Sequence, residues 1–200
     1  MQLVADRLAC VRGGREVFAD LSFSVDAGDV LVITGTNGAG KSSLLRMIAG
    51  LAPVAAGHIG LRAASREFSL AEQSHYLGHQ DACKVALTVT ENLDFWTDYI
   101  GAGTGGGRVN RALDAVGLGA LADLPAAYLS AGQRRRLSIA RLVAVRRPVW
   151  LLDEPNSVLD VAAQKQLAAI MSAHLKSGGL IVAAAHGPIG LKRDRRLRLA

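Results

Sequence analysis

Short apolar runs, and segments that alternate apolar with polar residues, dominate the hydrophobic pattern of the chain. Residues 20–25 (DLSFSV) alternate in this way, which is typical of a half-buried strand. Three further runs are almost wholly apolar: residues 30–34, 149–153 and 180–185. Continuous apolar runs of this length predict strands that are covered on both faces of a sheet.

Segments with helical spacing lie between these strands. The expected helices cover residues 42–51, 90–100, 134–147 and a stretch around 167–175. Thr90 is expected to cap the helix at 90–100. Because strands and helices alternate along the chain, we expect parallel strands joined by right-handed crossovers.

Residues 83–128 interrupt this alternation with helices alone. They hold the helix at 90–100, a flexible glycine-rich loop at 101–107 and a short helix marked by Val109, Leu113 and Val116. At 200 residues the chain fits one compact domain. We predict a single domain whose α/β core is built from residues 1–82 and 129–200, with 83–128 as an inserted helical subdomain.

The charge of the chain is uneven. Its 23 Lys and Arg residues exceed its 17 Asp and Glu residues, and 13 of the basic residues but only 4 of the acidic ones follow Gln133. A solvated basic face, a nearby anionic membrane surface and bound nucleic acid would all account for this excess. Charge alone does not choose among the three.

The two cysteines, Cys10 and Cys83, form no cluster that is typical of a metal site. We expect reduced thiols, as in a cytosolic protein. The first residues lack the charged and apolar regions of a signal peptide, and no apolar stretch is long enough to span a membrane. The expectation is a chain that is soluble by itself.

Residues 35–42 carry the pattern Gly-x-x-x-x-Gly-Lys-Ser between a predicted strand and a predicted helix, which is the context that a phosphate-binding loop needs. The helix N-terminus adds partial positive charge. Lys41 would reach the β- and γ-phosphates, and the Ser42 hydroxyl would bind Mg²⁺. The predicted contacts to the nucleotide are Gly35, Thr36, Asn37, Gly38, Ala39, Gly40, Lys41, Ser42 and Ser43.

Two acidic residues follow the apolar run at 149–152. A carboxylate at the carboxyl end of a core strand lies where α/β sheets bind their ligands. Asp153 would complete the ligands of Mg²⁺, and Glu154 would polarise the attacking water. The sequence therefore predicts a nucleotide-hydrolysing enzyme with Mg²⁺ as a cofactor.

A second group of residues suited to phosphate lies at 129–133. Ser130 can cap the helix that begins near Arg134, and Gly132 allows a close approach of the backbone. The group resembles the signature of the ATP-binding cassette (ABC) ATPases and consists of Leu129, Ser130, Ala131, Gly132 and Gln133. In that family the signature of one subunit closes over the nucleotide of its twin, which implies a homodimer with two equivalent sites. The resemblance also implies that the nucleotide is ATP. It further implies a P-loop NTPase core of the α/β class, with an antiparallel β subdomain and an inserted helical subdomain.

Further family elements follow in order. Asp160, in SVLD at 157–160, resembles the D-loop, and His186 resembles the switch histidine that contacts the γ-phosphate and the water. The Q-loop glutamine falls by spacing on His79, although the neighbouring Gln80 could also serve. The aromatic residue that stacks on adenine falls on Arg12, whose guanidinium plane can also stack.

Three stretches resemble one branch of the family, the haem exporter ATP-binding subunits of bacterial cytochrome c maturation. They are residues 10–25, 76–96 and 128–142. The resemblance implies integral-membrane partner subunits and a peripheral location on the cytoplasmic face of the bacterial inner membrane. Such partners dock beside the Q-loop, and the candidate contacts, which could equally be core residues, are Phe95, Trp96 and Tyr99.

Two alternatives remain open. The chain could power export of another substrate, such as a lipid, peptide or drug, because substrate choice lies in the membrane subunits. An ABC ATPase that acts on nucleic acid is the other alternative, but such proteins usually carry coiled coils or tandem cassettes, for which 200 residues leave no room. We therefore expect no nucleic-acid partner.

Overall fold

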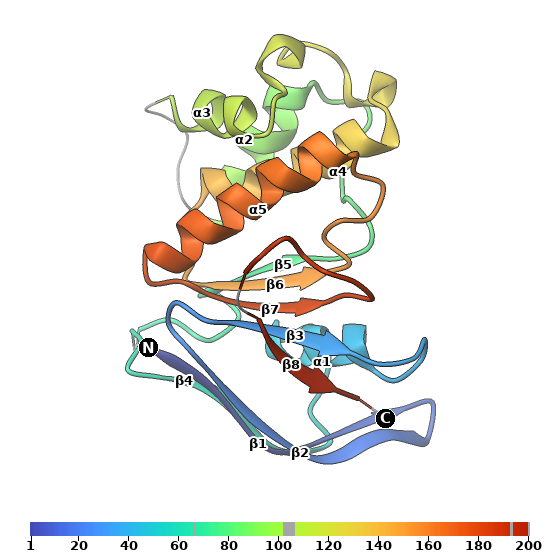
Figure 1. The fold of residues 1–200 in the computed structure, drawn as a ribbon. Coiled ribbons are helices and arrows are strands. Elements are labelled where there is room, and N and C mark those ends of the chain that lie inside the picture. The colour runs from blue at the N-terminus through green and yellow to red at the C-terminus, as the bar shows by residue number, and fades with distance from the viewer. Residues whose placement is uncertain (66, 102–106, 193, 200) are drawn as a thin grey trace. The chain divides into compact units, whose positions relative to one another are not determined.

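A computed structural model describes the chain except for residue 66, residues 102–106, and residues 193 and 200 (Figure 1). The loop expected at 101–107 thus lies mostly outside the described residues. Contacts between Cα atoms group the chain into two compact units. The sheet unit comprises residues 1–78, 147–155 and 171–200, and the helical unit comprises residues 79–146 and 156–170.

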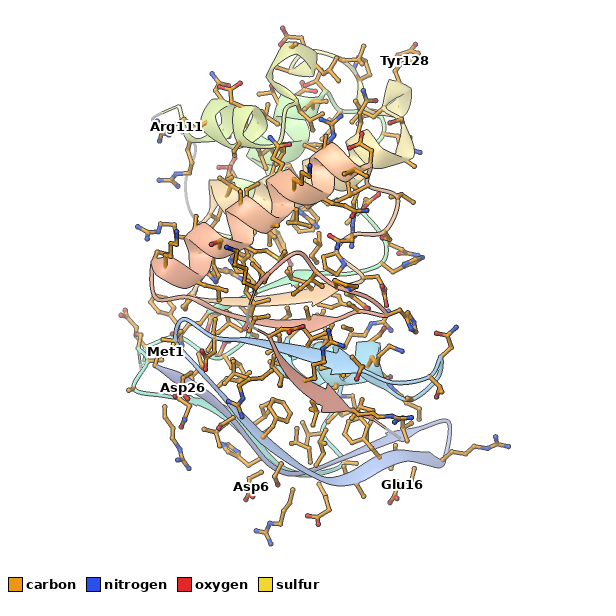
Figure 2. The ribbon with its side chains drawn as sticks, in the orientation of Figure 1. Met1, Asp6, Glu16, Asp26, Arg111 and Tyr128 are labelled. Atoms are coloured by element: carbon orange, nitrogen blue, oxygen red, sulfur yellow. The ribbon has the colours of Figure 1, made fainter. Side chains whose placement is uncertain are left out.

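The sheet unit contains a three-stranded antiparallel sheet in the order β2-β1-β4. Its strands are β1 (Gln2–Arg12), β2 (Arg15–Asp26) and β4 (Ala56–Arg62). Gly13 and Gly14 join β1 to β2 with φ of 56° and 75°, which suits a tight hairpin. Side chains such as Asp6 and Glu16 project away from this sheet (Figure 2). The strand expected at 20–25 is the second half of β2.

A five-stranded parallel sheet in the order β5-β6-β7-β3-β8 forms the other layer of the sheet unit. The strands are β3 (Val30–Thr34), β5 (Ser74–Leu77), β6 (Val149–Asp153), β7 (Leu180–Ala184) and β8 (Arg195–Arg198). The expected strands at 30–34 and 149–153 are confirmed, and that at 180–185 ends one residue earlier. The short polar strand β5 and the basic strand β8 lack an apolar run, and the sequence pattern missed both.

Helix α1 (Lys41–Ile48) packs into the core of the sheet unit. Leu44, Leu45 and Ile48 share that core with buried residues of both sheets, such as Leu3 and Val182. Burying this apolar face stabilises the unit by roughly 1.5–3 kcal/mol per large side chain. The core therefore anchors the helix that begins at the predicted phosphate loop.

The helical unit contains α2 (Val89–Tyr99), α3 (Arg108–Ala115), α4 (Ala131–Ala144) and the short helices η1 (Gly119–Leu121) and η2 (Ala126–Tyr128). Helix α5 (Val161–Lys176) begins in this unit, and residues 171–176 group with the sheet unit. The boundaries 83–128 for an inserted subdomain stay a prediction. Within the described part of the chain, no helix has the length and apolar character needed to cross a membrane.

The helix bounds differ from the predicted ones: α1 covers Lys41–Ile48 rather than 42–51, and α4 covers Ala131–Ala144 rather than 134–147. The caps explain the starts of α2 and α4. Thr88 rather than Thr90 caps α2, because Thr88 and Glu91 satisfy each other's backbone N–H groups in a capping box. The Thr90 hydroxyl instead donates to the carbonyl oxygen of Ala122. Helix α4 begins at Ala131, three residues before the expected start at Arg134, since its cap is Ser130 itself.

Candidate functional site

The predicted phosphate loop connects β3 to α1 and depends on glycines at positions where a side chain would not fit. Gly35 has a φ of 147°, and a Cβ atom there would lie 2.6 Å from the carbonyl oxygen of Leu199. Gly40 has a φ of 94°, and its Cβ atom would lie 2.6 Å from Cγ1 of Val17. At Gly38 a Cβ atom would meet nothing within 4 Å. The outer glycines therefore let the loop pack closely, and the middle one borders open space.

Lys41 is held over this loop. Its side chain is buried, and its ammonium group donates to the carbonyl oxygens of Gly35 and Thr36, both at 2.9 Å. The N-cap of α1 is Gly40, which offers no side chain to cap the helix, and no acidic residue lies in the first turn. The N-terminus of α1 thus combines partial positive charge with a neighbouring ammonium group, an arrangement that fits phosphate.

Ser42 and Asp153 lie together, as the sequence predicts for two ligands of one cation. The Ser42 hydroxyl donates to Oδ1 of Asp153 at 3.0 Å, and Asp153 is 4% exposed. Both groups supply the hard oxygen ligands that Mg²⁺ prefers. No group of three or more His, Cys, Asp or Glu side chains suited to a metal occurs among the described residues. The pair still fits Mg²⁺, which commonly binds few protein ligands beside substrate phosphates.

Glu154 and His186 lie at the carboxyl ends of neighbouring strands, β6 and β7. Nε2 of His186 is 3.6 Å from Oε1 of Glu154. The backbone N–H of Glu154 donates to the carbonyl oxygen of Ala184, and Glu154 has a φ of 47°, which is unusual for a residue with a side chain. The pairing of β6 with β7 thus holds Glu154 in a strained conformation beside His186.

Two contacts at the carboxylate of Asp153 escaped the sequence analysis. The Tyr76 hydroxyl donates to Oδ2 of Asp153 at 3.3 Å, and Nε of Arg46 donates to the same hydroxyl at 3.4 Å. Burial raises the pKa of Tyr76, although the hydrogen bond from Arg46 opposes this shift. Tyr76 lies on β5, a strand that no apolar run marks in the sequence. The pairing of β5 with β6 brings Tyr76 close to Asp153.

Arg12 is exposed at the end of β1, in the hairpin opposite Arg15. The same hairpin supplies Val17 and Phe18, against which Gly40 packs. The phosphate loop therefore rests on the hairpin that carries Arg12. Stacking of the Arg12 guanidinium on adenine stays a prediction.

In the helical unit, the signature residues form the start of α4. The backbone N–H of Gln133 donates to the Ser130 hydroxyl at 3.2 Å, and the Ser130 N–H donates to the Gln133 side chain at 2.7 Å. Leu129 is buried and Ser130 is exposed. A Cβ atom on Gly132 would lie 3.1 Å from the carbonyl oxygen of Val158, so that glycine serves packing within its own chain.

Other predicted residues of the helical unit have separate places. His79 and Gln80 are both exposed in a bend, and nothing in their surroundings selects one as the Q-loop residue.

Asp160 caps α5, because its Oδ1 accepts the backbone N–H of Ala163 at 2.8 Å. A structural role thus accounts for Asp160 within its own chain, and its D-loop role stays a prediction.

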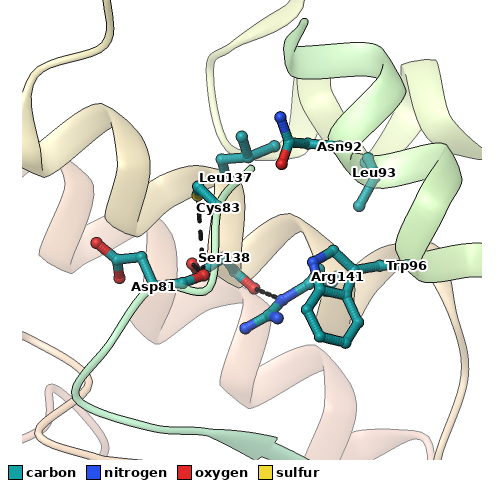
Figure 3. A pocket seen from close by; sticks show the side chains of 8 residues that line it. All are labelled: Asp81, Cys83, Asn92, Leu93, Trp96, Leu137, Ser138 and Arg141. Carbon is teal, nitrogen blue, oxygen red and sulfur yellow. Dashed lines mark hydrogen bonds between the residues drawn. The ribbon is translucent and has the colours of Figure 1, made fainter. Parts of the chain in front are cut away.

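A polar cluster joins the segment after Gln80 to α4 (Figure 3). Arg135, which is 1% exposed, lies 3.4 Å from Asp81, and the Ser138 hydroxyl donates to the carbonyl oxygen of Asp81. Arg141 lies over the ring of Trp96 at 4.5 Å, and burial lowers the pKa of Arg141 to about 10. The pocket that Asp81, Ser138 and Arg141 help to line has no room for a water molecule, so these side chains pack closely.

The aromatic residues on α2 differ in exposure. Trp96 is covered by Arg141, whereas Phe95 and Tyr99 stack with a centroid distance of 6.2 Å and are 37% and 74% exposed. Of the three candidate docking residues, Phe95 and Tyr99 are exposed and Trp96 is partly buried.

Known proteins resemble this chain in sequence. The family described as ABC transporter matches residues 18–157. "Cytochrome c biogenesis ATP-binding export protein CcmA" of Nitrobacter winogradskyi is 59% identical over 199 residues, which cover 100% of this chain and 98% of that protein. The protein of the same name from Rhodopseudomonas palustris is 56% identical over 201 residues, 100% of each chain.

Solved structures share the fold. A putative ABC transporter ATP-binding protein from Pyrococcus furiosus matches with a TM-score of 0.85 at 20% identity, over 100% of this chain and 98% of that one. An ATP-binding subunit of an ABC transporter matches with a TM-score of 0.82 at 24% identity, over 93% of this chain and 80% of that one. The expected fold class is confirmed.

Proposed function

We propose, on the premise that the chain belongs to the ABC transporter family, that it supplies the ATP hydrolysis for an export complex of cytochrome c biogenesis. Membership of the family makes the chain an ATP-hydrolysing transporter subunit. The observation that carries the finer assignment is full-length identity of 54% to 59% with relatives whose name states that role. Haem is the cargo that we propose, because residues 10–25, 76–96 and 128–142 resemble haem exporter subunits.

The arrangement in the sheet unit explains how the chain would act on ATP. An ammonium group has three N–H donors, and Lys41 uses two on its own loop, so the third can meet a phosphate oxygen. Ser42 and Asp153 would hold Mg²⁺, which neutralises charge on the β- and γ-phosphates when it is bound.

Glu154 is the base in this proposal. Its carboxylate takes a proton from the water that attacks the γ-phosphorus, while the bond from that phosphorus to the bridging oxygen of ADP breaks. His186, 3.6 Å from Glu154, keeps that carboxylate beside the water. ADP and phosphate leave, and the proton on Glu154 returns to solvent.

Two copies of the chain complete each site. The signature residues 129–133 of one subunit would close over the γ-phosphate that the other subunit holds, so a twofold axis gives two equivalent sites. This proposal is supported by the exposed Ser130 at the start of a 14-residue helix, whose dipole favours an anion. Integral-membrane subunits would dock on the helical unit at Phe95 and Tyr99, at the cytoplasmic face of the bacterial inner membrane.

Replacing Glu154 tests the hydrolytic role. Glu154→Gln is expected to lower ATP turnover by about 10²- to 10⁴-fold, because the amide cannot accept the proton. ATP binding should persist, and light scattering should detect an ATP-bound dimer that the wild type forms only transiently. Glu67→Gln, at an exposed position, is the control. Normal turnover in Glu154→Gln would remove Glu154 from the mechanism.

Membrane partners and cargo need a separate test. An affinity-tagged Glu154→Gln chain, extracted from membranes with ATP, should retain integral-membrane subunits of cytochrome c assembly, and deletion of its gene should abolish covalently bound haem in c-type cytochromes. Intact c-type cytochromes in the deletion strain would favour another exported substrate and overturn the assignment.

A further inference from the structure

Asp153 is oriented from two directions within the sheet unit. Its Oδ1 accepts the hydroxyl of Ser42 at 3.0 Å, and its Oδ2 accepts the hydroxyl of Tyr76 at 3.3 Å. The two donors come from different elements, α1 and β5, while Asp153 ends β6. Rotation of the carboxylate would therefore break a hydrogen bond on at least one side.

Arg46 extends the arrangement back to α1. Its Nε donates to the Tyr76 hydroxyl at 3.4 Å, so Tyr76 accepts from a cation and donates to an anion. Ser42 and Arg46 lie four residues apart on α1, one turn of one helix face. The same helix thus reaches Asp153 directly through Ser42 and indirectly through Tyr76.

The sheet register places Tyr76 for this contact. Tyr76 pairs with Leu151 across the parallel strands β5 and β6. Because side chains alternate along a strand, Leu151 and Asp153 project to one face, and Tyr76 projects to the same face of the neighbouring strand. The strand pairing therefore places Tyr76 beside Asp153. A change of side chain at Tyr76 leaves the backbone pairing of β5 with β6 intact.

An aspartate needs such partners if it is to present one oxygen reliably. The terminal torsion of Asp has broad minima, so the side chain does not fix the carboxylate by itself. Residues that hydrogen-bond to a metal ligand commonly govern metal affinity by orienting that ligand. Tyr76 meets this description, and the mechanism above gives it no other task.

We propose that Tyr76, itself held by Arg46, is a positioning residue that orients Asp153 for the divalent cation bound with ATP. The inference rests on the proposed function, because that function places the cation at Ser42 and Asp153. It goes beyond that function by assigning the cation's affinity to two residues outside the recognised motifs.

The decisive variant is Tyr76→Phe, which removes one hydroxyl and keeps the ring. The full chain is saturated with a non-hydrolysable ATP analogue, and free Mn²⁺ is titrated by electron paramagnetic resonance. We expect the Mn²⁺ affinity to fall about tenfold, as for other partners of metal ligands. Binding of the analogue in EDTA should equal that of the wild type, because the phosphate loop is unchanged.

Ser74→Ala is the matched control. The Ser74 hydroxyl is buried on the same strand and donates to the carbonyl oxygen of Leu70 at 2.6 Å, without a hydrogen bond to Asp153. Tyr76→Phe loses the hydrogen bonds to Asp153 and from Arg46, and Ser74→Ala loses one hydrogen bond. Both variants should therefore lower the melting temperature, but only Tyr76→Phe should alter Mn²⁺ affinity. An equal loss of Mn²⁺ affinity in Ser74→Ala would make the effect a general loss of stability and overturn the proposal.

Arg46→Met tests the indirect step. Because Arg46 acts through Tyr76 in this proposal, Arg46→Met should weaken Mn²⁺ binding less than Tyr76→Phe does. The double variant should match Tyr76→Phe alone, since residues of one network are not additive. Additive losses, or the same Mn²⁺ affinity in Tyr76→Phe as in the wild type, would overturn the inference and leave the proposed function intact. A wild-type chain that binds no nucleotide would overturn both.

Discussion

The starts of α1 and α4 differ in how their first backbone N–H groups are capped. Each helix begins with backbone N–H groups that have no partner within the helix. At α4, Ser130 and Gln133 form a capping box from their own side chains. At α1, the cap residue is Gly40, which has no side chain, and Lys41 is folded over the loop before it.

The difference fits the proposal that a phosphate binds at the start of α1, whereas α4 begins without a ligand. A helix start that side chains already satisfy is stable in the absence of an anion, and it can present Ser130 to a second molecule. A start without a side-chain cap gains most from a bound phosphate. Nucleotide should therefore stabilise the sheet unit directly, and the signature should depend on a twin.

Of the changes at these two helix starts, removing the positive charge at the start of α1 should have the largest effect, and that effect is on ATP binding. Lys41→Ala should weaken ATP binding by about a hundredfold, because a hydrogen bond between charged groups is lost. Fluorescence titration with an ATP analogue measures this. Lys176→Ala, at an exposed position on α5, is the control. Unchanged affinity in Lys41→Ala would contradict the phosphate-loop assignment.

The glycine at the start of α1 offers a second comparison. Gly40→Ala should lower the free energy of unfolding by about 2–3 kcal/mol, since its methyl group collides with Val17 in a backbone conformation that disfavours side chains. Gly13→Ala shares the positive φ but meets nothing within 4 Å, so it should cost less. Denaturant unfolding measures both. Equal losses would show that strain rather than close packing requires glycine at this position.

Removing a helix cap in the helical unit should have the smallest effect on stability. A comparison of two caps separates the capping role of Ser130 from a role in catalysis. Ser130→Ala and Thr88→Ala each remove one capping box and should each lower the free energy of unfolding by about 1 kcal/mol. If Ser130 also meets the partner's nucleotide, only Ser130→Ala should slow ATP turnover, by about tenfold. Equal turnover in the two variants would leave Ser130 as a cap alone.

Much of the site follows from neighbours in sequence. The spacing within residues 35–42 and the position of Asp153 after an apolar run predict that Ser42 and Asp153 are ligands of one cation. In the structure the two side chains lie together and share a hydrogen bond. The predicted cap at Ser130 is likewise confirmed. The predicted cap at Thr90 is wrong, because Thr88 and Glu91 have the spacing of a capping box and form one.

The sequence by itself determined the phosphate loop, the buried strands at 30–34 and 149–153 and the Ser130 cap, since each depends on residues that are close along the chain. Only the tertiary structure decided that Tyr76 and Arg46 meet at Asp153, and that Val17 fills the space beside Gly40. Those contacts follow from strand order and register. The chain has other tyrosine, arginine and valine residues. The pairing of distant segments determines which of them come into contact.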